Sequence, residues 1–276
     1  MDLWDSDKFL YNYKKNPKGA LITVSNNNRL VVKHFMSLST VTYKYDEVTQ
    51  FLESNPIKAG KIVFEDCKTH DAIEKYHHLG YKVAALNFAN SFTPGGGYLR
   101  GSHTQEEELC RQFPHLYASL ISSQLYPIKQ GTVLITPGIK RVREGIENGY
   151  KLISEPTTEV CFITAAAPDL NEHHKESIPT STFANHRETI NTTMKLVMTS
   201  SKTIADYNVL ILGAWGCGAF APRNIYKRNS HINQMANEIK KVCSHYRYLY
   251  DIIIFAIPDK SSENYKIFSS VFKSMI

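Results

Sequence analysis

The sequence lacks a long apolar run. The longest runs, at residues 160–168 and 252–258, fall far short of the roughly 20 residues that a membrane-spanning helix needs. The first eight residues, MDLWDSDK, are acidic where a signal peptide would be basic, and no apolar segment follows them. We therefore expect a soluble, intracellular protein that does not enter a membrane.

Cysteine is scarce, and its spacing forms no known pattern. The chain has 5 cysteines, an odd number, and no C-x-x-C. A disulfide framework is therefore not expected, which agrees with a reducing compartment. The histidine pairs at 77–78 and 173–174 lack the spacing of metal ligands, because adjacent histidines rarely bind one ion. We expect neither a metal nor a cofactor.

Charge of one sign is also in short supply. Lys and Arg total 32 against 26 Asp and Glu, so the net charge is only +6. This excess suits an anionic ligand, but it is too scattered to indicate a nucleic-acid-binding module. Apolar residues make up 42% of the 276 residues, which is enough for a large core and argues against disorder.

From about residue 60, short apolar runs alternate with helix-like patterns. We expect strands at 61–65, 82–88, 132–135, 159–165, 208–212 and 251–255. Helices are expected at 69–79, 104–125, 180–205, 222–244 and from 261, with a kink or break at Pro114. This alternation predicts a layered α/β domain over residues 59–276 with a largely parallel sheet. Residues 1–58 are less regular, and we interpret them as an N-terminal extension packed on the domain.

A glycine-rich turn follows the strand expected at 208–212. It contains Gly213, Gly216 and Gly218, and Pro222 is expected to be the first residue of the next helix. Converging backbone N–H groups and a helix N-terminus could cradle a phosphate. The turn lacks the Lys-Ser/Thr of a P-loop, so a purely steric strand-to-helix turn is the alternative.

A second glycine-rich turn follows the strand expected at 82–88. Gly95, Gly96 and Gly97 precede a seven-residue spacer and then Gln105, which begins a run of three glutamates. Three consecutive glycines suggest close approach of a ligand. The alternative is structural, because Thr104 and Glu107 have the spacing of a capping box and acidic residues suit the first turn of a helix.

These motifs together resemble one known family. The Gly95–Gly97 turn with its spacer and Gln105-Glu106-Glu107 is similar to the signature of the poly(ADP-ribose) glycohydrolases of microbial type, a branch of the macrodomain superfamily. The segments LNFAN at 86–90, FITAAAP at 162–168 and GAWGCGAF at 213–220 are similar as well, in the same order. The resemblance runs from about residue 60 to the C-terminus. It implies a macrodomain-like three-layer α/β/α sandwich with a mixed central sheet.

The resemblance also implies roles for individual residues. Glu107 would be the general acid/base, and Glu106 would hold a ribose hydroxyl. The substrate-binding residues would be Asn90, Gly95, Gly96, Gly97, Gln105, Gly216, Cys217, Gly218 and Phe220, with the last four around the diphosphate and the distal ribose. The sequence departs from the family at Pro222, where an asparagine is common. Cys217 near a helix N-terminus could alternatively be a nucleophile with a lowered thiol pKa.

The implied reaction is hydrolysis of the ribose–ribose O-glycosidic bonds of poly(ADP-ribose), with release of ADP-ribose. Expected partners are poly(ADP-ribose) or ADP-ribosylated protein, and ADP-ribosylated nucleic acid is a further candidate. Two alternatives stay open. One is a hydrolase that removes single ADP-ribose groups from protein or DNA, and the other is a non-catalytic macrodomain that only binds ADP-ribose. The chemistry leaves a tension, since a helix N-terminus favours ionised carboxylates whereas a general acid must carry a proton.

Overall fold

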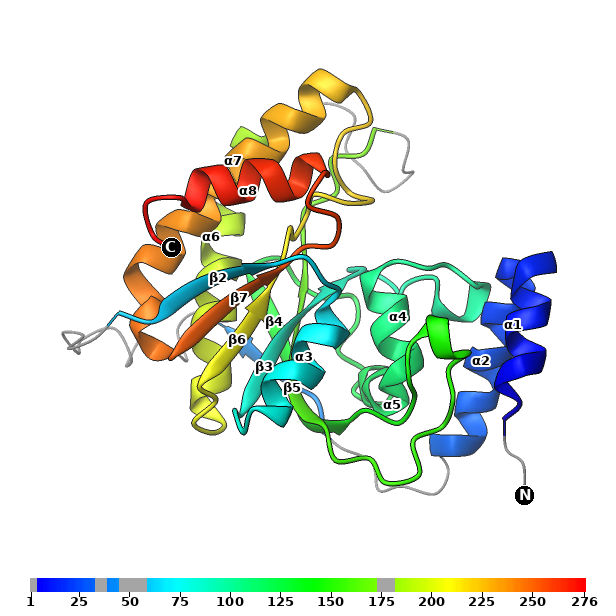
Figure 1. The fold of residues 1–276 in the computed structure, drawn as a ribbon. Helices are drawn as coiled ribbons and strands as arrows, with labels where there is room; N and C mark the ends of the chain where they lie inside the picture. The colour runs from blue at the N-terminus through cyan, green and yellow to red at the C-terminus, as the bar shows by residue number, and fades with distance from the viewer. Residues whose placement is uncertain (1–3, 33–38, 45–58, 173–181) are drawn as a thin grey trace.

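The computed structural model describes residues 4–32, 39–44, 59–172 and 182–276. These residues form a seven-stranded sheet in the order β1-β4-β5-β3-β6-β7-β2 (Figure 1). The strands are β1 (Val41–Lys44), β2 (Lys61–Glu65), β3 (Val83–Ala89), β4 (Thr132–Lys140), β5 (Glu159–Ala166), β6 (Val209–Leu212) and β7 (Ile252–Ala256).

The sheet is mixed rather than largely parallel. The five strands from β5 to β2 run parallel to their neighbours, as the alternation of strands and helices predicts. The β1–β4 and β4–β5 pairs are antiparallel. The expected strand at 132–135 is confirmed in position, and its antiparallel direction is a feature that local periodicity does not encode. The mixed sheet implied by the resemblance is confirmed.

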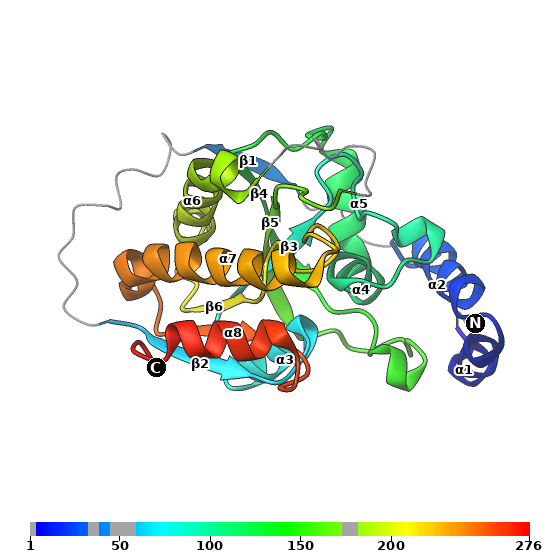
Figure 2. The same ribbon diagram turned by 90° about the horizontal axis from the view of Figure 1, so that it is seen from above.

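Helices cover both faces of the sheet. On one face lie α3 (Thr69–His78), α4 (Gln105–Gln112) and α5 (Pro114–Ser122); on the other lie α6 (Phe183–Thr199), α7 (Ile225–Tyr246) and α8 (Glu263–Phe272) (Figures 1 and 2). In β3, Ala84 and Leu86 face the second helix layer, whereas Ala85 and Ala89 face the first. Because both faces are covered, the strand is almost entirely apolar.

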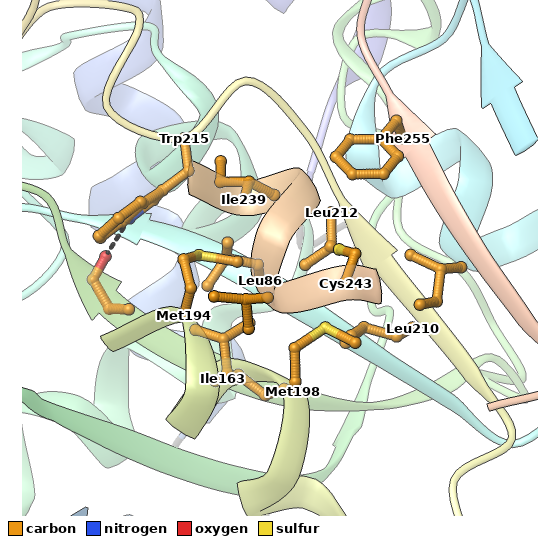
Figure 3. Packing of buried hydrophobic residues seen from close by; sticks show 14 of the residues in the cluster. Leu86, Ile163, Met194, Met198, Leu210, Leu212, Trp215, Ile239, Cys243 and Phe255 are labelled. Carbon is orange, nitrogen blue, oxygen red and sulfur yellow. Dashed lines mark hydrogen bonds between the residues drawn. The ribbon is translucent and has the colours of Figure 1, made fainter. Parts of the chain in front are cut away.

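The core between the sheet and α6 and α7 is shown in Figure 3. Leu86 and Ile163 from the strands meet Met194 of α6 and Ile239 of α7. At the edge of this core, the buried Trp215 donates a hydrogen bond of 3.0 Å from Nε1 to the carbonyl of Ala165. This bond fixes the turn after β6 to the end of β5.

Two proline signals had different outcomes. Pro114 ends one helix and begins the next, so the predicted break is confirmed. The prediction that Pro222 begins a helix is wrong. The helix begins three residues later, at Ile225, because the side chain of Asn224 accepts hydrogen bonds from the N–H groups of Tyr226 and Lys227 and forms the N-cap.

The N-terminal residues form two helices, α1 (Ser6–Lys15) and α2 (Pro17–Val32), which lie outside α4 and α5 (Figure 2). Ser25 donates a 2.9 Å hydrogen bond to the carbonyl of Tyr98, and Asn28 donates one of 3.0 Å to the carbonyl of Arg111. The predicted domain boundary at residue 58 lies outside the described residues and stays a prediction. None of the described helices is long and apolar enough to span a membrane.

Candidate active site

A cleft of about 620 Å³ opens where the carboxyl ends of the central strands meet the first turn of α4. Both glycine-rich turns contribute to its wall. Of the predicted site residues, the cleft is lined by Asn90, Gly96, Gly97, Gln105, Glu106, Glu107, Gly216, Gly218 and Phe220. Gly95 and Cys217 do not line it. The fold thus brings together two motifs that lie more than a hundred residues apart in the chain.

Glu107 is buried and held by three hydrogen bonds. Its Oε1 accepts a hydrogen bond of 2.8 Å from the N–H of Gly97. Its Oε2 accepts one of 2.9 Å from the N–H of Thr104 and a second from the Thr104 hydroxyl. Glu107 therefore completes the capping box that the spacing predicts, and it lines the cleft as well. The structural interpretation is confirmed, and the catalytic role of Glu107 stays a prediction.

Glu106 is the more deeply buried of the two glutamates, at 2% exposure. Its Oε2 accepts a 2.8 Å hydrogen bond from the N–H of Asn90, and Asn87 Nδ2 lies 3.4 Å from its Oε1. Burial raises the pKa of Glu106 to about 8, and the charge of Glu107 adds to this, against the lowering effect of the hydrogen bonds. Glu106 therefore favours its protonated form at neutral pH.

The three consecutive glycines are explained in part by these carboxylates. Gly96 has a positive φ of 55°, and a Cβ there would lie 2.7 Å from Oε1 of Glu107 and 3.0 Å from Oε2 of Glu106. A Cβ at Gly97 would lie 2.0 Å from the hydroxyl oxygen of Ser102. The turn thus packs against the protein's own acidic groups, a reason for glycine that the sequence did not reveal.

The side-chain amide of Gln105 is occupied by protein groups. Its Oε1 accepts a 2.9 Å hydrogen bond from the N–H of Phe88, and its Nε2 donates bonds of 2.7 Å to the carbonyl of Leu86 and 3.1 Å to the hydroxyl of Thr69. Gln105 therefore fastens the start of α4 to the end of β3. Its predicted role in binding substrate stays a prediction, with both ends of the amide already bonded.

Asn90 is placed differently. Its Oδ1 accepts hydrogen bonds of 2.9 Å from the N–H of Phe92 and 2.8 Å from that of Thr93, which fixes the start of the glycine turn. Its amino group, Nδ2, makes no hydrogen bond within the described residues. Since Asn90 lines the cleft, this donor is available to a ligand.

In the turn after β6, two glycines face the cleft. Gly216 has a positive φ of 74°, which favours glycine, and its carbonyl is 2.9 Å from Nε2 of His231. A Cβ placed on Gly218 would meet no atom within 4 Å. The protein's own packing therefore gives no steric reason for glycine at 218, which leaves room for a ligand against the backbone.

Cys217 points away from the cleft into the core between the sheet and α7. Burial raises the pKa of its thiol, so the alternative of a nucleophile with a lowered pKa is wrong. The helix that was expected to lower this pKa begins eight residues later, at Ile225. The backbone N–H of Cys217 donates a hydrogen bond of 3.1 Å to the carbonyl of Ala214. Cys217 is a core residue, and its buried side chain cannot act as a nucleophile in the cleft.

Several residues of the cleft wall were missed from the sequence. Lys68, His70, Arg100, Ser102 and His103 all line the cleft. Three of them, Arg100, Ser102 and His103, lie in the seven-residue spacer. The position of this spacer between two motifs was the available signal in the sequence. No group of three or more His, Cys, Asp or Glu side chains in the described part of the chain is arranged to hold a metal ion.

A mixed sheet between two helix layers, with its cleft at the carboxyl ends of the strands, defines a macrodomain-like protein. The chain matches the family model of the microbial-type poly(ADP-ribose) glycohydrolase (PARG) catalytic domain over residues 14–135, so the resemblance is confirmed. The match begins inside the segment that was interpreted as an N-terminal extension. Among curated proteins, none matches the chain.

Solved PARG structures share the fold across nearly the whole chain. The enzyme from Thermomonospora curvata, bound to the inhibitor ADP-HPD, has a TM-score of 0.72 at 21% identity and covers 91% of this chain and 99% of its own. The enzyme from Deinococcus radiodurans, in complex with ADP-ribose, has a TM-score of 0.70 at 23% identity and covers 86% of this chain and 95% of its own.

Proposed function

We propose that this protein is a poly(ADP-ribose) glycohydrolase, which hydrolyses the ribose–ribose bonds of poly(ADP-ribose) and releases ADP-ribose. The observation that carries the proposal is the pair Glu106 and Glu107, buried side by side between two glycine-rich turns in one cleft. A protein that only binds ADP-ribose has no need of two buried carboxyl groups at this position, because burying them costs free energy. The match to the PARG family model supports the same conclusion.

The cleft provides separate places for the parts of one ADP-ribose unit. Its volume of about 620 Å³ is within the usual range of roughly 300–1,000 Å³ for small-molecule sites. The diphosphate would lie on Gly216 and Gly218, which both line the cleft and of which Gly218 is exposed. The distal ribose would lie between Asn90, Gly97 and Phe220, above the two glutamates.

In the reaction, Glu107 acts as the general acid and then as the base. Its carboxyl group gives a proton to the leaving oxygen while the bond from that oxygen to the anomeric carbon breaks. Water then attacks the oxocarbenium-like carbon, and the proton that it loses returns to Glu107. Oε1 of Glu107 accepts a hydrogen bond from Gly97 alone, which leaves a second lone pair on that oxygen for the proton.

Glu106 has a different part, because adjacent residues on a helix point about 100° apart. Burial keeps its carboxyl group protonated at neutral pH, with a pKa of about 8. As a neutral group it donates a hydrogen bond to a ribose hydroxyl and places no negative charge beside the general acid. The tension between an ionised helix N-terminus and a protonated acid is thereby reduced.

Replacing Glu107 with Gln tests this function. Gln at this position still completes a capping box, so the fold is expected to persist. Release of ADP-ribose from poly(ADP-ribose) should be lost, whereas calorimetric binding of ADP-ribose should remain within a few-fold of the unchanged protein. Glu188→Gln, at an exposed position of α6, is the matched control. Near-normal turnover in Glu107→Gln would refute the assignment.

Substrate class is tested by three separate incubations, with poly(ADP-ribose), with mono-ADP-ribosylated protein and with ADP-ribosylated DNA. Release from the polymer at the highest rate supports the proposal. Release only from the single-unit substrates would instead identify a mono-ADP-ribosyl hydrolase. Binding without release from any of the three would identify an ADP-ribose reader.

A further inference from the structure

The wall of the cleft next to Glu107 carries charged side chains that the proposed chemistry does not use. Residues 98–104 join the Gly95–Gly97 turn to α4. Within this segment, Arg100, Ser102 and His103 are exposed and line the cleft. His103 is followed directly by Thr104, the residue that is hydrogen-bonded to Glu107. Arg100 and His103 therefore line the same cleft as the general acid.

His103 is held by Glu108, the third glutamate of the run. Its Nε2 lies 3.1 Å from Oε2 of Glu108, which is buried and also accepts hydrogen bonds of 2.5 Å from the hydroxyl of Tyr150 and 2.8 Å from Nε2 of Gln112. Burial acts to raise the pKa of Glu108, but the bonds from His103 and Tyr150 outweigh it and lower the pKa to about 2. Glu108 is thus an ionised anchor beneath the wall of the cleft.

This anchoring determines which imidazole nitrogen is free. Because an ionised carboxylate only accepts hydrogen bonds, Nε2 of His103 must carry a proton. Its Nδ1 makes no hydrogen bond to any described residue, and the side chain is 36% exposed. When the ring is doubly protonated, Nδ1 donates as well. His103 can then bind an anion at the cleft wall while Glu108 holds it in place.

The segment that presents these side chains is clamped from the opposite side. The guanidinium of the buried Arg111 donates a 2.7 Å hydrogen bond to the carbonyl of Ser102. Helix α2 contributes the bond from Ser25 to the carbonyl of Tyr98, and its Lys18 carbonyl lies 2.5 Å from the position of a Cβ on Gly101. The cationic wall is therefore preorganised, and α2 has a place in its support.

We propose that Arg100 and His103 form a subsite for phosphate on the leaving-group side of the scissile bond, where the next ADP-ribose unit of the polymer lies. This rests on the proposed function. The diphosphate of the ADP-ribose unit that is released is assigned to Gly216 and Gly218. The cationic side chains of Arg100 and His103 are therefore left for the unit that remains on the polymer. Each unit carries a diphosphate, and an arginine beside a charged imidazole complements it. Arg100 forms no ion pair within the described residues.

The test compares His103→Gln with His78→Gln. His78 is an exposed histidine at the C-terminal end of α3. Gln keeps a donor for Glu108 and lacks the charge. Values of kcat and KM are measured for poly(ADP-ribose) and for ADP-ribose that carries an uncharged aryl leaving group. His103→Gln should raise KM for the polymer by about fivefold to tenfold, the size of one charge-assisted hydrogen bond at a half-exposed site. The increase for the aryl substrate should be several times smaller.

His78→Gln should leave KM for both substrates unchanged. Equal KM increases on both substrates in His103→Gln, or no increase on the polymer, would overturn the subsite. A larger effect on ADP-ribosylated single-stranded DNA than on the polymer would overturn its assignment to the polymer. If the unchanged protein hydrolyses nothing, the proposed function fails. The subsite is then judged by the affinity for poly(ADP-ribose), which should fall in His103→Gln.

Discussion

The buried carboxyl group of Glu106 makes stability depend on pH in a direction that can be measured. Its pKa rises from 4.5 in the unfolded chain to about 8 in the folded protein, mainly because it is buried. A raised pKa means that the folded state favours the protonated form. The associated stability is fully present below pH 4.5 and is lost as pH rises through 8. Glu106→Gln removes this dependence, because an amide does not titrate.

The size of the effect follows from the shift. At 1.36 kcal/mol per pKa unit, a rise from 4.5 to about 8 corresponds to about 5 kcal/mol well above pH 8. Between pH 5 and pH 9 the free energy of unfolding of Glu106→Gln should therefore increase by about 4 kcal/mol relative to the unchanged protein. The glutamine can still accept the hydrogen bond from the N–H of Asn90, so packing changes little.

Urea unfolding at pH 5, 7 and 9, followed by tryptophan fluorescence, measures this difference. Glu188→Gln on the exposed side of α6 controls for the loss of a carboxylate as such, and its difference from the unchanged protein should not vary with pH. The reasoning is refuted if the Glu106→Gln difference is constant from pH 5 to pH 9 or changes in the opposite direction. Activity gives a second readout, since hydrolysis by the unchanged protein should decline above about pH 8 as Glu106 loses its proton.

Three further substitutions test the supports of the site. Thr104→Val removes the hydroxyl that bonds Glu107 and should lower the free energy of unfolding by about 1 kcal/mol in urea titrations, whereas Thr104→Ser should retain it. Asn28→Ala leaves buried groups of Arg111 and Arg143 unpaired and should cost about 2–4 kcal/mol, with a single unfolding transition if α2 folds together with the domain. Trp215→Phe removes the bond to the carbonyl of Ala165 and should weaken ADP-ribose binding in calorimetry, with a stability loss of about 1 kcal/mol.

Local signals predicted most of the elements. The break at Pro114 and the apolar strand β3 follow from residues that act on their immediate neighbours. The error at Pro222 is local too, since a proline that suits a first helical position competes with a better cap at Asn224. The antiparallel direction of β4 depends on connections across the chain, which periodicity does not contain.

The site was predictable in its motifs and unpredictable in its contacts. The two glycine turns and the glutamate run identified the cleft, because each turn follows the end of a strand and the glutamates begin the helix after the Gly95–Gly97 turn. The partners of Glu108 were hidden, since Tyr150 lies 42 residues away in the chain. The direction of the Cys217 side chain is decided by packing against α7, so its burial could not be inferred from the loop sequence.

Gly96 and Gly218 separate two reasons for glycine in this cleft. A methyl group at Gly96 would clash with the carboxylates of Glu106 and Glu107 and would have to adopt a positive φ, so Gly96→Ala should lower the free energy of unfolding by about 1–3 kcal/mol. At Gly218 the same methyl group meets no protein atom. Gly218→Ala should therefore leave stability within about 0.5 kcal/mol and still weaken ADP-ribose binding, because it fills space that the diphosphate needs. Urea unfolding measures the stability of both variants, and calorimetric titration measures their affinity for ADP-ribose. Unchanged affinity in Gly218→Ala would mean that the diphosphate does not lie against this turn.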